Sequence, residues 1–166
     1  NMGNTYQKQG NLDKAMGSYN SALKFKSDYA EAWVNGADTL EKWNKLDQLT
    51  IWLKEAYKNF KILPSDILYF QCKLLWRKKE YKEASKLILS IDLETISDVH
   101  KQGFLNLKAK YFDLSKDFDK AYNCFSKMNL IAKESESYIN SNSEIFFNNI
   151  KDQLDKLKLK SFHISG

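Results

Sequence analysis

The stretch that decides the fold is NMGNTYQKQGNLDKA, residues 1–15, because its pattern returns three times along the chain. Its last residue, Ala15, has equivalents at Leu49, Ala84 and Ala121, and we call these four the register residues. The intervals between them are 34, 35 and 37 residues. A period in this range is typical of helical hairpins that stack side by side. The sequence therefore predicts an all-α solenoid.

Other positions keep the same distance from the register residues in all four units. A small residue stands twelve positions upstream, namely Gly3, Ala37, Cys72 and Ala109. Large apolar residues stand nine upstream (Tyr6, Leu40, Leu75, Phe112), three upstream (Leu12, Leu46, Tyr81, Phe118) and four downstream (Tyr19, Leu53, Ile88, Phe125). Small residues let two helices approach closely, and large residues fill the seam between them. The pattern indicates two packed helices in each unit.

The spacing also predicts where the helices begin and end. First helices are expected over 1–8, 30–43, 65–78 and 98–114, and second helices over 12–25, 46–61, 81–90 and 118–132. Residues 91–97 are expected to form a loop, with Asp98 as the cap of the helix that follows. Gly10 and Asn44 suit the left-handed conformation that ends many helices. Lys79 and Lys116 hold the equivalent places, so we expect those two turns to close without it.

After residue 132 the repeat is lost. Residues 133–142 are polar and rich in serine, and we interpret them as a linker. Ser141 and Glu144 have the spacing of a capping box. This predicts an amphipathic helix over 143–157 that covers the open end of the stack, with apolar residues at Ile145, Phe146, Ile150, Leu154 and Leu157. Because the chain opens in mid-motif, we read it as a fragment, and 158–166 as a tail leading toward a missing domain.

Residues 1–15, together with Ala30-Glu31-Ala32-Trp33 at the start of the next unit, resemble the tetratricopeptide repeat. The resemblance implies a tetratricopeptide-type helical-hairpin solenoid of about four repeats with a C-terminal helix. Residues 1–132 divide into repeats at 1–29, 30–64, 65–97 and 98–132. The last two repeats depart from the pattern, because they lack the turn glycine and have longer connections.

The family resemblance also implies a function and a site. It implies a non-catalytic scaffold that binds a protein or peptide in a concave groove lined by the first helices. Carrying the register across gives the candidate groove residues Asn1, Asn4, Lys8, Glu31, Asn35, Asp38, Lys42, Phe70, Lys73, Arg77, Leu107 and Lys110. For each of them, simple exposure to solvent is the alternative explanation.

Two details of this groove narrow the partner that the family resemblance implies. Asn1 and Asn35 match the asparagine that holds an extended peptide backbone in some family members, but Phe70 and Leu107 occupy the equivalent later places. The clamp that holds a chaperone's C-terminal carboxylates needs lysine, asparagine and arginine at set positions. Val34, Asp38 and Phe70 stand there instead, which argues against a chaperone C-terminus as the ligand.

A second resemblance concerns the fourth unit. Residues 114–121 and 125–129 are similar to repeats that precede a sulfotransferase domain in certain bacterial proteins. That resemblance implies an alternative function, a regulatory or substrate-presenting region whose catalytic domain lies outside this sequence. We expect no enzymatic activity of this chain, and leave that of a longer parent open.

Composition limits the remaining classes of function. The net charge of +5 rests on scattered lysines, since Arg77 is the lone arginine. Nucleic-acid binding favours clustered basic residues with arginine forks, so we do not expect a nucleic-acid partner. Cys72 and Cys124 are isolated, and no phosphate loop or catalytic motif occurs, so no metal, cofactor or catalytic residue is expected.

The sequence also gives expectations for location and for its tryptophans. It contains no apolar run of the length needed to span a membrane and opens without a secretory signal, and we expect a cytoplasmic protein. Trp33 stands at a packing position and is expected in the core. Trp43 and Trp52 are harder to place, and either could be an exposed contact for a partner.

Overall fold

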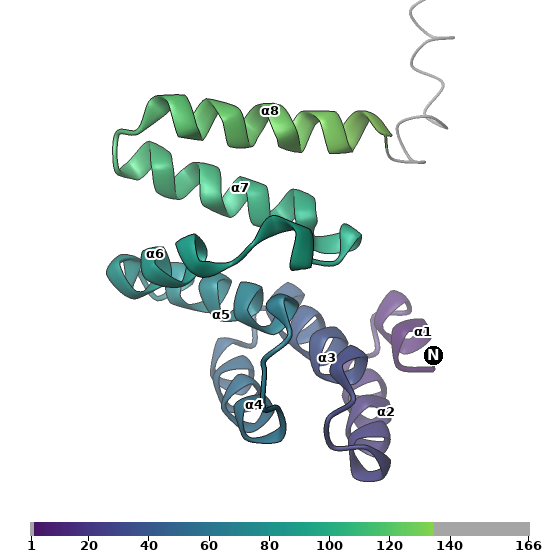
Figure 1. Ribbon diagram of the computed structural model, residues 1–166. Coiled ribbons are helices and arrows are strands. Elements are labelled where there is room, and N and C mark those ends of the chain that lie inside the picture. Colours follow the sequence, from purple (N-terminus) through teal and green to yellow (C-terminus); the bar gives the residue numbers. More distant parts are fainter. Residues whose placement is uncertain (1, 135–166) are drawn as a thin grey trace, which may run out of the picture.

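The computed structural model describes residues 2–134, and these form helices with no β-strand among them. The elements are α1 (Met2–Lys8), α2 (Leu12–Phe25), α3 (Ala30–Lys42), α4 (Leu46–Asn59), α5 (Ser65–Arg77), α6 (Tyr81–Ser90), the 3₁₀ turn η1 (Leu93–Thr95), α7 (Asp98–Leu114) and α8 (Phe118–Glu134). Consecutive helices pair as hairpins, and the hairpins stack along the molecule (Figure 1). The predicted all-α stack of helical hairpins is confirmed.

The helix bounds agree with the predicted ranges within two residues, and three details differ. The predicted loop over 91–97 contains the turn η1, and the cap of α7 is Ser97 rather than Asp98. Asp98 lies inside the first turn, where its carboxylate pairs with Lys101 at 2.9 Å. Helix α8 continues to Glu134, so the predicted linker starts two residues too early.

Some predictions fall on residues that the structure does not describe. Asn1, the rest of the linker (135–142), the helix over 143–157 and the tail lie outside the described residues. The division into repeats at residues 29, 64, 97 and 132 also stays a prediction.

All four first helices end with the same turn. The residue after each helix's C-cap has positive φ: 76° at Gly10, 55° at Asn44, and 62° at both Lys79 and Lys116. The next backbone N–H then donates to the carbonyl five residues back, at 2.9 Å in every case, and the acceptors are Tyr6, Leu40, Leu75 and Phe112. This pairing is the Schellman motif.

The prediction that Lys79 and Lys116 avoid the left-handed conformation was therefore wrong. Left-handed backbone costs an L-residue about 1–2 kcal/mol. Here the turn satisfies carbonyls that would otherwise lack partners at the helix end. The acceptor residues Leu75 and Phe112 are also the large apolar residues of the register, so the same turn positions their side chains in the hairpin.

Close approach between paired helices depends on small residues, at the predicted position in the first hairpin and one position before it in the second. A Cβ on Gly36 of α3 would overlap the indole of Trp52 on α4, and a Cβ on Gly3 of α1 would overlap the ring of Tyr19 on α2. The indole N–H of Trp52 donates to the Trp33 carbonyl at 2.8 Å, which satisfies the buried polar group. All four register residues are buried, including Ala84 and Ala121.

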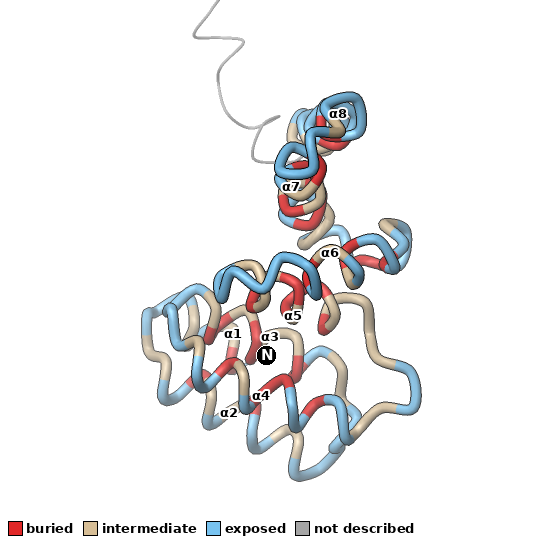
Figure 2. Tube along the Cα trace, turned by 90° about the vertical axis from the view of Figure 1, so that its left-hand side faces the viewer, coloured by how far each residue is buried: buried red, intermediate tan, exposed pale blue. Residues whose placement is uncertain are grey.

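The apolar interior divides into two clusters. Figure 2 shows buried positions in the lower hairpins and also along α7 and α8. The larger cluster runs from α2 to the first half of α7, with Tyr19, Phe70 and Phe104 among its fully buried side chains. The smaller one joins α7 to α8 through Leu105, Ala109, Phe112, Ala121 and Cys124. Among the described helices, α8 packs extensively only against α7.

Two predicted seam residues of the fourth hairpin are not buried. Phe118 is 63% exposed and Phe125 is 37% exposed. These two rings are exposed because α7 covers one side of α8 and no described helix covers the side that the rings occupy. The seam pattern is therefore only half fulfilled at this end of the stack.

Replacing Ala121 with leucine should test the fourth hairpin. The residue is 4% exposed between α7 and α8, so Ala121→Leu overpacks the smaller cluster and should lower the free energy of unfolding by about 1–3 kcal/mol. Urea denaturation measures the change. Tyr122→Leu, at the next and exposed position of α8, is the matched control and should leave stability nearly unchanged.

Lys79→Gly should stabilise the protein, because glycine removes the cost of left-handed backbone while losing some entropy on folding. We expect a net gain of about 0.5–1 kcal/mol, and a similar gain for Lys116→Gly. Lys82→Gly, at an exposed position inside α6, should instead cost about 1 kcal/mol. Thermal melts of the three variants measure these changes in stability. If the glycine variants of Lys79 and Lys82 lose equal stability, the assignment of the turn is wrong.

Candidate functional site

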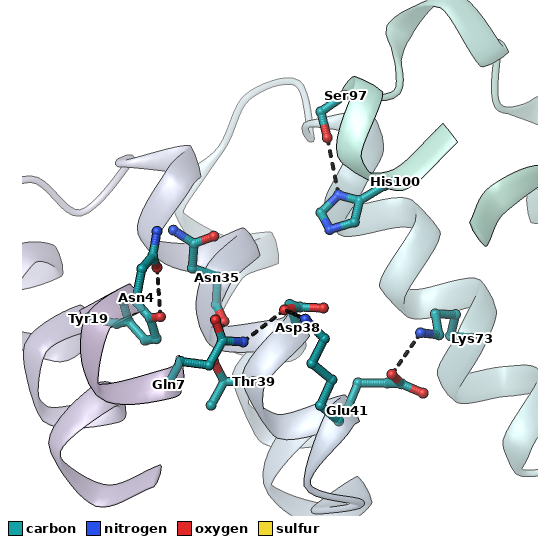
Figure 3. Close-up of polar contacts among 11 residues, drawn as sticks. Asn4, Gln7, Tyr19, Asn35, Asp38, Thr39, Glu41, Lys73, Ser97 and His100 are labelled. Carbon is teal, nitrogen blue, oxygen red and sulfur yellow. Dashed lines mark hydrogen bonds and ion pairs between the residues drawn. The ribbon is translucent and has the colours of Figure 1, made fainter. Parts of the chain in front are cut away.

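The candidate site is a hollow of about 590 Å³ that the first helices α3, α5 and α7 line. Helix α3 contributes Glu31, Asn35 and Asp38 to its wall, α5 contributes Asp66 and Tyr69, and α7 contributes His100 and Gly103. These elements lie one after another because the hairpins stack with their first helices adjacent. Figure 3 shows Asn35 and Asp38 on one side and His100 on the other. The volume is within the usual range of ligand sites.

A polar contact bridges each neighbouring pair of first helices. Between α1 and α3, the Gln7 amide donates to Asp38 Oδ2 at 2.8 Å. Between α3 and α5, Lys73 Nζ lies 2.7 Å from Glu41 Oε2. Between α5 and α7, His100 Nδ1 lies 2.5 Å from Asp66 Oδ1. We call these three contacts the polar bridges, and Figure 3 shows the first two.

Asp66 carries the densest set of contacts in the hollow. Besides His100, it accepts a hydrogen bond from the Ser97 hydroxyl at 2.6 Å and one from the Ser97 backbone N–H at 3.3 Å. Burial by itself would raise the pKa of Asp66, but the hydrogen bonds from His100 and Ser97 together lower that pKa below its ordinary value. The carboxylate is therefore held charged and oriented at the start of α5.

Tyr69 forms the central wall of the hollow between α3 and α7. Burial raises the pKa of its hydroxyl strongly, and the carboxylates of Glu41, Asp38 and Asp66 raise it further. Lys73 Nζ lies over the same ring, 5.5 Å from its centroid. Tyr69 thus lies among three carboxylates in a chain whose net charge is positive.

Gly103 leaves space for the side chain of Tyr69. It lies on α7 directly against the tyrosine hydroxyl, and a Cβ at this position would overlap that oxygen. The absence of a side chain at Gly103 therefore keeps the hollow open between α5 and α7.

Only some of the predicted groove residues line the hollow. Glu31, Asn35, Asp38 and Lys42 line the hollow, and Lys42 pairs with Asp38 at 2.6 Å. Lys73 and Arg77 both bind Glu41 rather than facing the hollow, and Arg77 also donates to Asn44. Asn4 accepts a hydrogen bond from the Tyr19 hydroxyl at 2.9 Å. Lys8 and Lys110 are exposed outside the hollow, and Asn1 lies outside the described residues.

Phe70 and Leu107 were predicted to lie in the groove, but both are buried in the larger apolar cluster and neither lines the hollow. Phe70 packs edge-on against the His100 ring at 5.1 Å between centroids. Their register position therefore points between neighbouring first helices. Asn35 has the same register, and among the described residues its buried Nδ2 has no hydrogen-bond partner.

The sequence analysis missed several residues of the hollow, among them Asp66, Tyr69 and His100. Asp66 stands eighteen positions before its register residue, as Glu31 does, and Tyr69 stands fifteen before, as Val34 does. The repeat register could therefore have found both. His100 has no such signal, because Asp28 and Leu63 occupy the equivalent positions and share none of its chemistry.

The tryptophans belong mostly to the core. Trp33 is buried as predicted, and Trp52 is buried too, with 4.7 Å between the two ring centroids. Trp52 is therefore not an exposed contact. Trp43 is 41% exposed but lies outside the hollow.

A second hollow of about 650 Å³ lies along α2 and α4. Its lining includes Met16 from α2, and Ile51 and Trp52 from α4. It is larger than the first hollow, but the polar bridges lie between first helices and away from it. We therefore regard the hollow of α3, α5 and α7 as the candidate site.

Residues 2–134 contain neither a cluster of metal-ligating side chains nor a membrane-spanning helix. In this part of the chain, no three His, Cys, Asp or Glu side chains gather in a way that could hold a metal ion. None of its helices combines the length and the apolar character needed to cross a bilayer.

Comparisons with known proteins agree with this architecture. Residues 3–42 match the family model described as TPR repeat, the tetratricopeptide repeat. The fold is similar to a solved structure titled "Crystal structure of MamA", with a TM-score of 0.55 and 15% sequence identity. The alignment covers 95% of this chain and 98% of that one, and at such low identity it shows the fold alone. Comparison with curated proteins gives no match.

The Asp66 contacts predict a dependence of stability on pH. Because folding lowers this pKa, the carboxylate stabilises the native state above its unfolded pKa of about 3.9, and that contribution is lost as pH falls through the lower folded value. Asp66→Asn should cost about 1–2 kcal/mol at pH 7 and less at pH 3. Urea denaturation at both pH values measures this. Asp28→Asn, an exposed loop carboxylate, should show no such difference.

Proposed function

We propose that this chain, a stack of hairpins with the tetratricopeptide-repeat fold, is a non-catalytic scaffold that binds an extended segment of a partner protein. The segment lies in the hollow of α3, α5 and α7. The observation that carries the proposal is the convergence of polar side chains from three stacked helices on one hollow with apolar walls. Tetratricopeptide repeats generally mediate protein–protein interactions, which supports the same function.

The lining of the hollow favours a particular partner chemistry. Asn35 brings an amide whose hydrogen-bonding capacity the described residues do not use, and a peptide carbonyl is a suitable acceptor for it. Carboxylates outnumber cations, since Glu31, Asp38 and Asp66 face a single lysine, Lys42. The partner segment therefore carries lysine or arginine next to an exposed backbone. The same excess of carboxylates disfavours a nucleic acid.

The alternative of a sulfotransferase-associated region stays a prediction. The residues that carry that resemblance, 114–129, form the end of α7, a turn and much of α8. Nothing in their arrangement favours that setting over any other helical hairpin. The scaffold function is therefore the one proposed for the chain.

Peptide binding by the full 166-residue chain tests the proposal. Twelve-residue peptides selected by phage display are labelled, and their Kd values are measured by fluorescence anisotropy. Asn35→Ala and Glu31→Lys should each weaken binding about tenfold, since a lost charge-assisted or buried hydrogen bond is worth roughly 1.4 kcal/mol. Selected sequences should be enriched in lysine and arginine.

Ile51→Glu is the matched control for this experiment. Ile51 is 62% exposed and lines the second hollow, so its replacement should leave affinity unchanged. Circular dichroism melts show whether each variant is folded. If Ile51→Glu abolishes binding while the α3 variants bind normally, the partner uses α2 and α4, and the proposed site is wrong.

A further inference from the structure

A groove runs along the second helices α2 and α4, and α3 lies between them as its floor (Figure 1). Its middle is the hollow of about 650 Å³ described above. A hollow of about 480 Å³ at the turn before α2 shares Leu12, Asp13 and Lys45 with it, and one of about 470 Å³ at the C-terminal end of α2 shares Asn20 and Trp33. We call the three hollows together the outer groove. Because α2 and α4 each contain 14 residues, the outer groove is about 20 Å long.

The floor of the outer groove is apolar, and its polar groups already have partners. Trp33, Trp52 and Met16 are part of the lining. The indole N–H of Trp33 donates to the Ser27 carbonyl at 2.8 Å, and the indole N–H of Trp52 donates to the Trp33 carbonyl at 2.8 Å. A segment of extended backbone on this floor would bury N–H and C=O groups without partners. A helix satisfies those groups internally, so the floor favours a helix as the occupant.

Gly17 of α2 leaves a space in the wall of the outer groove that no described residue fills. The other glycines within the described helices, Gly3, Gly36 and Gly103, each make room for an aromatic side chain of the chain itself. A Cβ on Gly17 would meet no described atom within 4 Å. Glycine makes a helix less stable than alanine does, and no packing contact among the described residues offsets that cost here. The space at Gly17 is therefore available for a large side chain of an occupant.

The two ends of the outer groove differ in charge. The end at the turn carries both signs, with Asp13 on α2 and Lys45 at the start of α4. At the other end, Lys24 is the charged residue of the lining, and it forms no ion pair with a described residue. Glu55, in the middle of the groove, is already paired with Lys58 at 2.6 Å. An occupant with an acidic residue at the Lys24 end complements this charge. Acidic side chains are favoured in the first turn of a helix, so the N-terminus of an occupant helix lies at that end.

We propose that the outer groove binds an amphipathic helix of a partner protein. The helix has about four turns, places a large apolar side chain against Gly17, and carries aspartate or glutamate in its first turn beside Lys24. Trp43, which is 41% exposed and lines the end at the turn, adds an aromatic contact there. The outer groove shares no lining residue with the hollow of α3, α5 and α7, so this site goes beyond the proposed function.

Selection of helical peptides tests this site. A phage library of helical peptides of about 18 residues, randomised on one face, is selected against the full chain, and Kd values are measured by fluorescence anisotropy. We expect binders with a large apolar residue at the centre of that face and an acidic first turn. Gly17→Leu should weaken their binding about tenfold while it raises the melting temperature, because leucine favours the helix and fills the space. Lys24→Glu should weaken binding about threefold.

Two further variants are controls. Ser21→Leu adds a leucine one turn farther along α2, at an exposed position outside the lining of the groove, and should leave Kd unchanged. Asn35→Ala, in the hollow of α3, α5 and α7, should also leave it unchanged, which separates this site from the proposed function. The proposal is wrong if no helix is selected, or if the selected helices bind Gly17→Leu as tightly as the parent. It is also wrong if sedimentation shows a dimer that Gly17→Leu dissociates, because the occupant is then a second copy of the chain.

Discussion

The close approach of two helices at a residue without a side chain is the constraint on which the structure depends. Gly36 leaves room for the Trp52 indole, and Gly3 leaves room for the Tyr19 ring, so in the first two hairpins the second helix seats a large aromatic group against its first helix. Interiors are packed at nearly crystalline density, and an added methyl group at these contacts has nowhere to go. This separation of the helices in turn determines how the first helices lie beside one another.

Polar contacts form across that row of first helices. The three polar bridges use different chemistry: an amide with Asp38, an ammonium with Glu41, and an imidazole with Asp66. Each bridge joins side chains about one repeat apart in sequence. The pair of Lys73 and Glu41 contributes little to stability, whereas Asp66 contributes more because it also accepts two hydrogen bonds from Ser97. The larger effect of the bridges is on geometry, since two of them orient Asp38 and Asp66, which are carboxylates that face the hollow.

The helices and their hairpin pairing could be predicted because both follow from positions repeated at fixed distance. The hollow was predicted only in part. Asn35 and Phe70 share a register yet differ in burial, since that position points between helices and accepts either an amide or a ring. The register could have found Asp66, but His100 depends on a contact between helices that no local pattern encodes. The left-handed backbone of Lys79 and Lys116 was not predicted because lysine seldom adopts this conformation. The hydrogen bonds that close the turn outweigh that preference.

Helix α7 takes part in both apolar clusters, with Phe104 and Leu107 in the larger and Leu105 and Phe112 in the smaller. Stacked repeats interact with their nearest neighbours, so a disturbance decays along the stack. Within residues 2–134, motion or damage at α8 therefore reaches the hollow through one helix, the one that carries His100 and Gly103. The hollow and the end of the stack can then diverge separately in evolution, as long as the two faces of α7 are both kept.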